Sequence, residues 1–390
     1  MMRIALLTDG IYPHVIGGMQ KHSFYLAKYF AQNKINVDLY HPITNTENAF
    51  LKEFSSEESK YIHPIFVKFP KSVYFPGHYI YESYKYSKNI FEKYIQRKPV
   101  DFIYAQGFCG WEMIKQKKGG IDSISPIGIN FHGLNMFQKA FDLRTRLNNV
   151  LFKPAVKFNL LYTDYTFSLG GKLSSLIYKV ANKRSNIIEI PVGVDLSWLT
   201  EENKLKNNKP LSFVFVGRYD KVKGIDILNN AIKNLVSDKK LFEVNLIGPF
   251  PSNLQLKYNN VRYYGEIKDI HELKELLTKN DVLISSSYSE GMPTVIIEAM
   301  ACGLAVIATD VGAVSELIDE KNGILISPGK TKALEDAILK FSGFTSEKII
   351  MMKKQSIKKV KQHYLWSEII RKTIVEIEKI VANKKNDYYH

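Results

Sequence analysis

The sequence predicts an α/β protein of two domains, each built on a parallel sheet. Its 390 residues are enough for two domains of ordinary size. In both halves short apolar runs alternate with amphipathic segments, which is the pattern of strands and helices in parallel α/β folds. Residues 201–210 are polar and end in Pro210, so we expect a linker there between the halves.

The first half alternates strand-like and helix-like segments. The expected strands are 3–8, 36–40, 101–105, 126–131 and 187–190. The expected helices are 19–33, 78–96 and 171–182, together with a broken helical segment at 141–161. Open parallel sheets bind ligands beyond the carboxyl ends of their strands, so the loops after these strands are candidate sites.

The second half repeats this type of architecture without obvious sequence similarity to the first. The expected strands are 211–216, 242–247, 261–264, 281–285, 304–308 and 323–326, with helices between them. Residues 345–382 are expected to form two helices that are interrupted near 364–366. No internal repeat of short period is visible.

Cysteine usage and hydropathy favour a cytoplasmic protein. Cys109 and Cys302 are the only cysteines and lie in different halves, so no disulfide framework is expected. Residues 1–10 have only a short apolar run, which predicts a first strand and not a signal peptide. No apolar run reaches the length of about 18 residues that a membrane-spanning helix needs.

The net charge of +15 points to anionic partners. Residues 1–200 hold 25 Lys or Arg against 15 Asp or Glu, so the excess is concentrated in the first half. A nucleotide diphosphate, an anionic membrane or a nucleic acid would fit this charge. The sequence has no helix-turn-helix, zinc-finger or RNP-like pattern, which argues against nucleic acid.

Glu290 and Glu298 form the most informative pair. Glu290 lies in a turn-rich segment after the strand 281–285, and Glu298 lies in a helix that begins near Pro293 and ends before Gly303. That helix is apolar on every face, so we expect it to be buried. A buried carboxylate needs a partner, and a polyhydroxylated ligand is one candidate.

Two cations follow the first strand of the second half. Arg218 and Lys223 stand at the mouth of a strand–helix unit, where a planar guanidinium and a compact ammonium suit a diphosphate. The alternative is a solvated loop, which is our interpretation of the neighbouring Lys221.

Two motifs of the first half also follow strands. Gly17 and Gly18 precede a helix, where glycines let the backbone approach a phosphate; the alternative is an ordinary loop-to-helix junction. His132 ends the strand 126–131 and, taken alone, is better explained as a histidine with a structural partner.

Together these motifs resemble the retaining GT-B glycosyltransferases of family 4, the glycosyl transferases group 1. The resemblance covers nearly the whole chain, in the order of the family. It rests on Gly17-Gly18, Phe131-His132-Gly133, Pro191-Val192-Gly193-Val194-Asp195, Val216-Gly217-Arg218, Lys223-Gly224, and the E-x7-E pair Glu290 and Glu298.

The resemblance implies a GT-B fold, with two Rossmann-like domains facing across a cleft. The acceptor-side domain would comprise residues 1–200, and the nucleotide-sugar domain residues 211–365. Residues 366–390 would form a C-terminal helix that crosses back onto the N-terminal domain. All the motifs would then face the cleft.

The resemblance also implies roles for individual residues. Glu290 would contact hydroxyls of the transferred sugar, Glu298 the ribose, and His132 the donor sugar. Arg218 and Lys223 would stabilise the charge that develops on the leaving diphosphate. The donor would also be bound by Gly17, Gly18, Gly291, Met292 and Thr294.

The implied reaction is transfer of a hexosyl unit, with retention, from a UDP- or GDP-linked sugar to a saccharide or lipid-linked acceptor. A role in cell-envelope polysaccharide or glycolipid synthesis fits. No cofactor and no metal are expected, because the sequence lacks a D-x-D motif and an Asp/Glu cluster. A glycosidase is disfavoured because one carboxylate lies in an apolar helix. A GT-B nucleotide-sugar epimerase and a non-catalytic glycosyltransferase-like subunit remain as alternatives.

Two basic stretches of the first half are candidates for contact with a membrane. Residues 72–98 contain eight aromatic residues and five Lys or Arg, and residues 139–184 contain nine Lys or Arg against two Asp. Such segments suit the anionic inner face of the plasma membrane. The alternative is that the aromatic residues fill the core and the lysines form a solvated face.

Overall fold

The computed structural model describes residues 1–15, 17–42, 50–138, 143–184, 186–207, 210–237 and 242–387. The chain divides into two compact units. Unit 1 comprises Met1–Pro191 and Trp366–His390, and unit 2 comprises Val192–Leu365. Each unit is a parallel α/β domain, so the α/β prediction is confirmed.

The division between the units falls before the expected linker at 201–210. Residues from Val192 onward group with unit 2 because they bond to it: Thr200 N donates to Ala301 O, and Cys302 Sγ lies 3.8 Å from Trp198 O. Within the polar segment, Glu202–Lys204 form a short 3-10 helix. Residues 208–209 lie outside the described part of the chain.

Unit 1 is built on a seven-stranded parallel sheet in the order β3-β2-β1-β4-β5-β6-β7. Its strands are β1 Arg3–Leu7, β2 Asn36–His41, β3 Ile62–Phe66, β4 Phe102–Gln106, β5 Ile127–Asn130, β6 Tyr165–Ser168 and β7 Ile187–Glu189. The central strands β4 and β5 are fully buried, as expected for a sheet that is covered on both faces.

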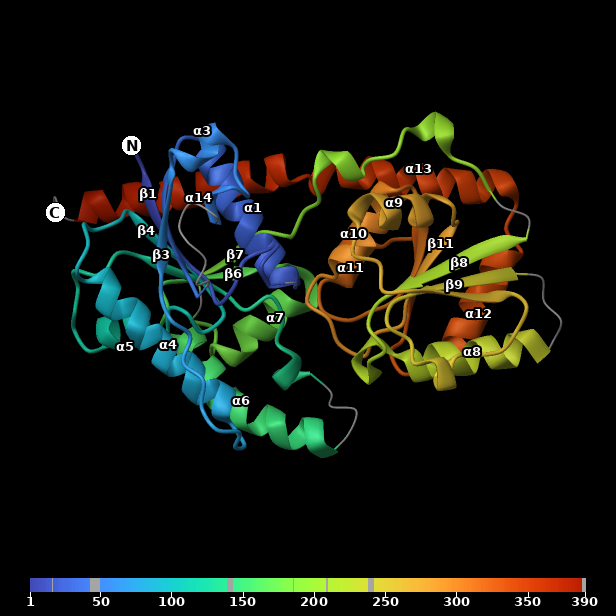
Figure 1. The fold of residues 1–390 in the computed structure, drawn as a ribbon, viewed down its shortest axis with the longest axis horizontal. Helices are drawn as coiled ribbons and strands as arrows, with labels where there is room; N and C mark the ends of the chain where they lie inside the picture. Colours follow the sequence, from blue (N-terminus) through green and yellow to red (C-terminus); the bar gives the residue numbers. More distant parts are fainter. Residues whose placement is uncertain are drawn as a thin grey trace. The chain divides into compact units, whose positions relative to one another are not determined.

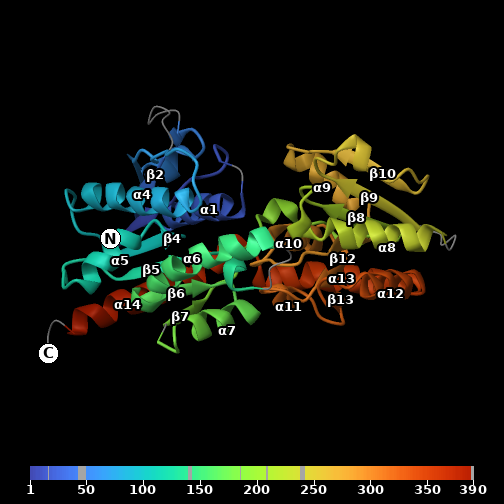
Figure 2. The same cartoon turned by 90° about the horizontal axis from the view of Figure 1, so that it is seen from below.

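Helices cover both faces of this sheet (Figure 1). One group consists of α1 Gly18–Gln32, α3 Ser56–Ser59 and α14 Trp366–Asp387, and both α3 and α14 pack on α1. The other consists of α4 His78–Tyr94, α5 Trp111–Lys118, α6 Leu143–Tyr162 and α7 Gly171–Val180. Figure 2 shows these last four helices side by side, each in contact with the next.

Unit 2 has a six-stranded parallel sheet in the order β10-β9-β8-β11-β12-β13. Its strands are β8 Leu211–Val216, β9 Phe242–Ile247, β10 Val261–Gly265, β11 Val282–Ser285, β12 Ala305–Thr309 and β13 Gly323–Ile326. Its helices are α8 Ile225–Ser237, α9 Ile270–Thr278, α10 Thr294–Ala301, α11 Val314–Leu317, α12 Thr331–Ser342 and α13 Ser346–His363. Contacts join α8 to α12 and α10 to α13.

Unit 1 has two strands and two helices that the sequence did not predict, and it has one continuous helix where a broken one was expected. The strands β3 and β6 and the helices α3 and α5 were missed. The segment expected to be broken is one helix from Leu143 to Tyr162, with Pro154 inside it. Pro154 removes one helical hydrogen bond, but buried neighbours such as Val156 and Leu160 keep the helix packed on the unit. Residues 141–142 of that prediction lie outside the described residues.

Each sheet has a topological switch point, where successive connections change direction. In unit 1 it lies between β1 and β4, and in unit 2 between β8 and β11. Parallel sheets form a crevice for ligands at this point, beyond the carboxyl ends of the strands. Across the described residues, no helix combines the length and the apolar character needed to cross a membrane.

Candidate functional site

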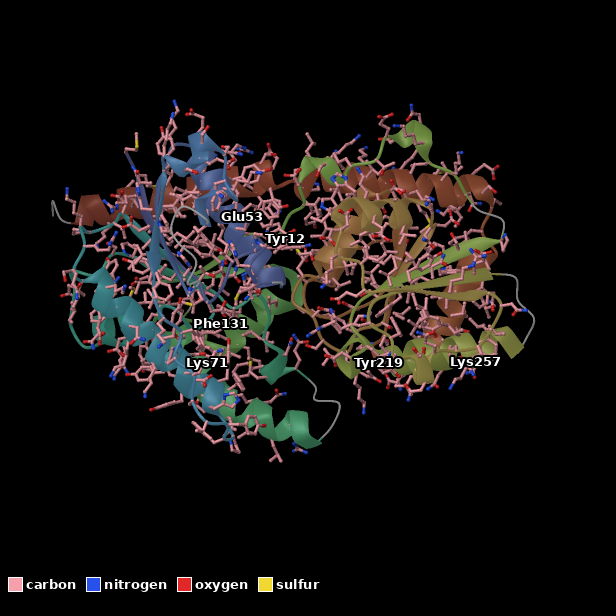
Figure 3. All side chains as sticks on the ribbon, viewed as in Figure 1. Tyr12, Glu53, Lys71, Phe131, Tyr219 and Lys257 are labelled. Atoms are coloured by element: carbon pink, nitrogen blue, oxygen red, sulfur yellow. The ribbon has the colours of Figure 1, made fainter. Side chains whose placement is uncertain are left out.

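In unit 2, the loops that follow β8 and β11 flank the switch point. The β8 loop runs from Gly217 to Gly224, where α8 begins, and Tyr219 of this loop is labelled in Figure 3. The β11 loop runs from Ser286 to Pro293, where α10 begins. These two loops carry five of the ten residues that the sequence singled out.

Lys223 and Glu290 are brought together between these loops. Lys223 Nζ lies 2.6 Å from Glu290 Oε1, and Ser287 Oγ donates to the same oxygen over 2.7 Å. Both side chains are partly exposed, at 26% and 14%. The sequence assigned these two residues separately, to a phosphate and to a sugar, and did not predict their ion pair.

The two loops are also tied through their backbones. Ser286 Oγ donates to the carbonyls of Lys223 and Gly224, and Tyr288 N donates to Val222 O. Gly224 has a φ of 67°, and a Cβ there would lie 2.0 Å from Ser286 O. Only glycine allows this approach, which fixes the position of Lys223 next to Glu290.

A third loop braces Glu290 from the β12 side. Gly312 has a φ of 56°, and a Cβ there would meet the carbonyl oxygens of Glu290 and Gly291. Ala313 N donates to Gly291 O over 2.7 Å. The backbone of the Glu290 turn is therefore held on both sides, so its carboxylate has a fixed place.

The remaining predicted residues of unit 2 lie near the same turn. Gly291 and Met292 precede α10, Thr294 begins it, and Glu298 lies buried inside it. Pro293 is the N-cap and not the first helical residue, and Gly303 follows the helix end with a φ of 81°. The prediction of a buried helix is confirmed.

Arg218 differs from the other residues predicted for this site. Its side chain is 79% exposed, and its guanidinium lies 3.9 Å from Asp220. Arg218 belongs to the same loop as Lys223 but does not take part in the Lys223–Glu290 contact.

In unit 1, His132, which follows β5, belongs to a hydrogen-bonded row of three side chains with Gln106 at the end of β4 and His22 in α1. His132 Nε2 lies 2.7 Å from Gln106 Oε1, and Gln106 Nε2 lies 3.0 Å from His22 Nδ1. The amide oxygen of Gln106 accepts and its nitrogen donates, so His132 carries its proton on Nε2 and keeps a lone pair on Nδ1. His132 has a φ of 56°, and Asn130 Oδ1 accepts from its backbone N.

Burial keeps this pair of histidines neutral. It lowers the pKa of His132 to about 3 and lowers the pKa of His22 well below its usual value. The rings of the two histidines lie 4.6 Å apart, and Trp366, the first residue of α14, lies 5.4 Å from His22. A neutral His132 is a hydrogen-bonding group and not a cation at neutral pH.

Gly17 and Gly18 lie at the start of α1, after β1. Gly17 is the N-cap, and no side chain caps the helix. Gln20 Nε2 donates to Asp9 Oδ1 over 3.1 Å, which brings Asp9 beside this helix start. Burial raises the pKa of Asp9.

Asp9 and Tyr79 line a cavity of about 170 Å³ at the carboxyl ends of the unit 1 strands. Tyr79 OH lies 3.4 Å from Asp9 Oδ2, and Phe131, labelled in Figure 3, lines the same cavity. Sequence reasoning missed Asp9, His22, Gln106 and Tyr79 as site residues. For Asp9 a signal existed, because it stands directly after a buried strand.

The described residues include no group of three or more His, Cys, Asp or Glu that could hold a metal ion. Cys109 and Cys302 are buried thiols, and burial raises the pKa of Cys302 to about 12. Neither thiol is activated as a nucleophile. The side chains described at the two switch points are thus suited to hydrogen bonding and to charge neutralisation.

Comparison with known families identifies a domain within unit 2. The family described as "Glycosyl transferases group 1" matches residues 210–342. Residues 210–342 are a glycosyl transferases group 1 domain. The group 1 domain contains Arg218, Lys223, Glu290 and Glu298, so the Lys223–Glu290 contact lies inside it.

Curated glycosyltransferases are similar to parts of the chain of different length. TuaC of Bacillus subtilis (strain 168), assigned as a teichuronic acid biosynthesis glycosyltransferase, is 36% identical over 183 residues. That match covers 45% of this chain and 46% of TuaC, about half of its length. WcaL of Escherichia coli (strain K12), assigned as a colanic acid biosynthesis glycosyltransferase, is 24% identical over 71% of this chain and 69% of WcaL.

Solved structures extend the likeness to both units. Sucrose-phosphate synthase from Thermosynechococcus elongatus has a TM-score of 0.79 at 19% identity and covers 98% of this chain and 100% of that chain. HepE of Anabaena in complex with UDP-glucose has a TM-score of 0.67 at 16% identity over 98% of this chain and 100% of that chain. The chain therefore has the GT-B fold, with the group 1 domain in unit 2.

Proposed function

We propose that the chain is a retaining glycosyltransferase of family 4. It would move a hexosyl unit from a nucleotide-diphosphate sugar to a saccharide or lipid-linked acceptor in cell-envelope polysaccharide or glycolipid synthesis. The observation that carries the proposal is the Lys223–Glu290 contact at the switch point of the group 1 domain. The assigned roles of TuaC and WcaL support the pathway, and the UDP-glucose bound to HepE supports a UDP-sugar donor.

The geometry of the group 1 domain suits a sugar diphosphate. An ammonium group has three N–H donors, so Lys223 can bind Glu290 and a phosphate oxygen together. The exposed guanidinium of Arg218 can reach a phosphate without first breaking a strong ion pair. Glu290 would accept from sugar hydroxyls, and Glu298 from the ribose. Backbone groups of Gly291, Met292 and Thr294 would complete the donor site.

The proposed step needs no covalent enzyme intermediate. The bond between the anomeric carbon and the diphosphate oxygen breaks, and the diphosphate leaves with the electron pair. The acceptor oxygen bonds the same face of that carbon, and its proton passes to an oxygen of the departing diphosphate. Lys223 and Arg218 would stabilise the charge that develops on this group.

Unit 1 would hold the acceptor and contribute to binding of the donor. His132 would accept a hydrogen bond from a sugar hydroxyl through its Nδ1 lone pair, since Nε2 is held by Gln106. The start of α1, with Gly17 and Gly18, would bind a phosphate group.

A donor screen tests the proposal. The melting temperature of the purified chain is measured with UDP-, GDP- and ADP-sugars. In a separate assay, consumption of each donor is followed in EDTA, with and without candidate acceptors. We expect one nucleotide class to raise the melting temperature, and sugar transfer to depend on the acceptor and to survive EDTA. Failure of every nucleotide to bind would contradict the proposal. Acceptor-independent formation of a new nucleotide sugar would show an epimerase instead, and loss in EDTA with rescue by Mn²⁺ would overturn metal independence.

A further inference from the structure

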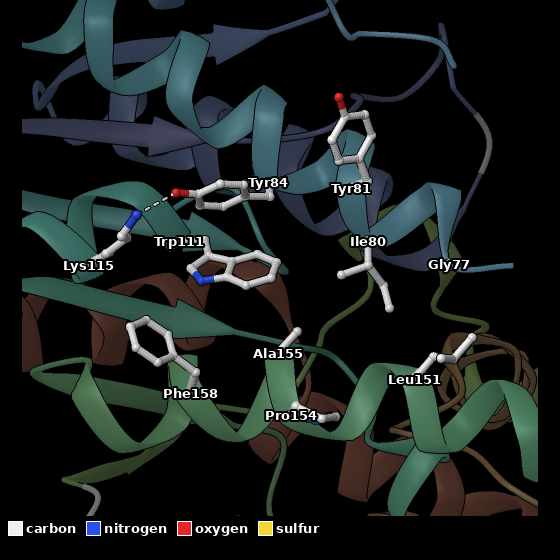
Figure 4. Close-up of a pocket in the computed structure, with 10 residues that line it drawn as sticks. All are labelled: Gly77, Ile80, Tyr81, Tyr84, Trp111, Lys115, Leu151, Pro154, Ala155 and Phe158. Atoms are coloured by element: carbon white, nitrogen blue, oxygen red, sulfur yellow. Dashed lines mark hydrogen bonds between the residues drawn. The ribbon is translucent and has the colours of Figure 1, made fainter. Parts of the chain in front are cut away.

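A groove on unit 1 lies apart from the cavity that contains Asp9. It has a volume of about 640 Å³ and is lined from α4, α5 and α6. Figure 4 shows side chains of α4 and of α6 on two sides, with Trp111 between them. The lining residues are Gly77, Ile80, Tyr81, Tyr84, Trp111, Lys115, Leu151, Pro154, Ala155 and Phe158. This is the size range of small-ligand sites, about 300–1,000 Å³.

The apolar lining of the groove continues onto the exposed surface of α6. Leu147 is 70% exposed, Val150 57% and Leu151 42%, and these residues precede Pro154 and Phe158 at helical spacing. Apolar side chains gathered on one exposed face of a helix mark an interaction site.

One end of the groove is cationic. Lys115 Nζ donates to Tyr84 OH over 2.8 Å, as Figure 4 shows, and Lys88 Nζ lies 5.6 Å from the centre of the Tyr84 ring. Lys118 Nζ lies 5.3 Å from the ring centre of Phe158, which lines the same end. An apolar trough that ends at ammonium groups is complementary to an apolar chain that carries a phosphate.

The three helices around the groove carry few acids. They contain ten Lys or Arg and three Glu. Two of these acids are buried and hydrogen-bonded inside the unit: Glu82 accepts from Ser72, and Glu112 accepts from Gln116. The surface around the groove therefore attracts an anion.

The helices α4 and α6 line both the groove and the Asp9 cavity. On α4, Tyr79 and Ser83 line the cavity, whereas Ile80 and Tyr84 line the groove. On α6, Phe152 lines the cavity and packs against Tyr79, with ring centres 6.1 Å apart. A ligand in the groove would thus contact the helices that also shape the cavity where the acceptor is proposed to bind.

We propose that this groove binds the apolar chain of a lipid-linked acceptor, with the lipid phosphate at Lys115, Lys118 and Lys88. The proposal rests on the proposed function and names its acceptor class. The groove is lined by α4, α5 and α6, and its apolar lining meets ammonium groups at one end. An apolar trough with a cationic end matches the chain and the phosphate of one lipid molecule. The acceptor lipid is therefore the occupant to which the geometry points.

Trp111 provides a direct signal for binding. Trp198 and Trp366 are buried, whereas Trp111 lines the groove, so a ligand there should shift the emission of one tryptophan. Farnesyl phosphate is the probe, with farnesol and inorganic phosphate as its chain-only and head-only counterparts. We expect a saturable blue shift with farnesyl phosphate, at least about tenfold weaker binding of either part, and no shift in Trp111→Phe.

Two substitutions locate the chain and the phosphate. Leu151→Glu places a carboxylate in the apolar trough and should weaken binding of farnesyl phosphate by about tenfold or more. Lys115→Glu should weaken the binding of farnesyl phosphate but leave the binding of farnesol unchanged. Met351→Glu and Lys358→Glu, at exposed positions of α13 in unit 2, are the matched controls and should bind like wild type.

The alternatives give different results. Absence of farnesyl phosphate binding overturns the proposal, and so does equal binding by Leu151→Glu. Binding only to phosphatidylglycerol vesicles would assign the surface to the membrane. A dimer that Leu151→Glu dissociates, without lipid binding, would assign it to a second copy of the chain. The rise in melting temperature with a nucleotide measures binding at the donor site alone. Absence of farnesyl phosphate binding would therefore contradict the groove proposal and leave the proposed glycosyltransferase function unaffected.

Discussion

Lys223 Nζ and Glu290 Oε1 lie 2.6 Å apart although the residues are 67 positions apart in the sequence. The contact joins the loop after β8 to the loop after β11 across the switch point of the group 1 domain. The proposed phosphate-binding cation and the proposed sugar-binding carboxylate are therefore an ion pair before any ligand binds. Substitution of either residue should therefore change the position and the charge environment of the other side chain.

Replacement of Lys223 tests whether the Lys223–Glu290 pair acts together. Lys223→Met removes the cation and should lower kcat/KM for sugar transfer by about 100-fold, since a fixed charge at a developing anion typically contributes that much. Lys221→Ala, an exposed lysine two positions earlier, is the control and should remain near wild type. A double-mutant cycle with Glu290→Gln should be strongly non-additive. Additive losses in the cycle would show that the pair does not act together.

Glu298 should act on nucleotide affinity. It is buried in α10, and its proposed partner is the ribose. Glu298→Gln keeps the shape but removes the charge, and should weaken binding of the nucleotide by about 2 kcal/mol, roughly 30-fold. Calorimetric titration with the nucleotide that the donor screen identifies measures this. Unchanged affinity together with wild-type turnover would remove Glu298 from the donor site.

The strands of unit 2 were predictable because each is a short, mainly apolar run, and the inner strands β11 and β12 are buried along their whole length. β8, with the sequence Leu-Ser-Phe-Val-Phe-Val, forms the expected strand 211–216 without shift, as do β9 and β13. β3 was missed because Pro64 interrupts its apolar run, and β6 because Tyr165–Ser168 is short and half polar. α5 has four charged residues and one glutamine among eight, which hides its buried face.

The candidate site was predictable only where its residues lie in one local motif. Glu290 and Glu298 belong to a single turn and helix, so their spacing is visible in the sequence. The contacts of Lys223 with Glu290 and of His132 with Gln106 join residues from different strand–loop units. Strand order creates these contacts, and strand order is not visible in the spacing. Asp9 and Tyr79 meet for the same reason.

A buried ion pair at the opposite end of the unit 2 sheet should contribute to stability. Lys353 Nζ lies 3.0 Å from Asp281 Oδ1 and also donates to the carbonyls of Lys206 and Asn280. Lys353→Ala leaves a buried carboxylate without its cation and should lower the free energy of unfolding by about 3–5 kcal/mol. Lys354→Ala, an exposed neighbour, should change it by less than about 0.5 kcal/mol. Urea unfolding of both variants makes the comparison, and equal stabilities would contradict the assignment.

Acid should destabilise unit 1 through its buried histidines. His41 is 3% exposed and stacks on Phe50, and burial lowers its pKa to about 4. An unfolded chain binds a proton at His41 below a pKa of about 6.5, whereas the folded chain does not until about 4. Stability is therefore fully present above about pH 6.5 and is lost as the pH falls toward 4. His22 and His132 shift in the same direction.

The expected size of this effect at His41 is a loss of about 2 kcal/mol between pH 7.5 and pH 5. In a Trp198→Phe background the remaining tryptophans, Trp111 and Trp366, both lie in unit 1, so their fluorescence in urea reports that unit alone. His41→Phe keeps a ring against Phe50 and removes the titration, so its unfolding free energy should fall less between the two pH values. His271→Gln, an exposed histidine of unit 2, should keep the wild-type difference. A wild-type pH difference in His41→Phe would show that another group causes the loss.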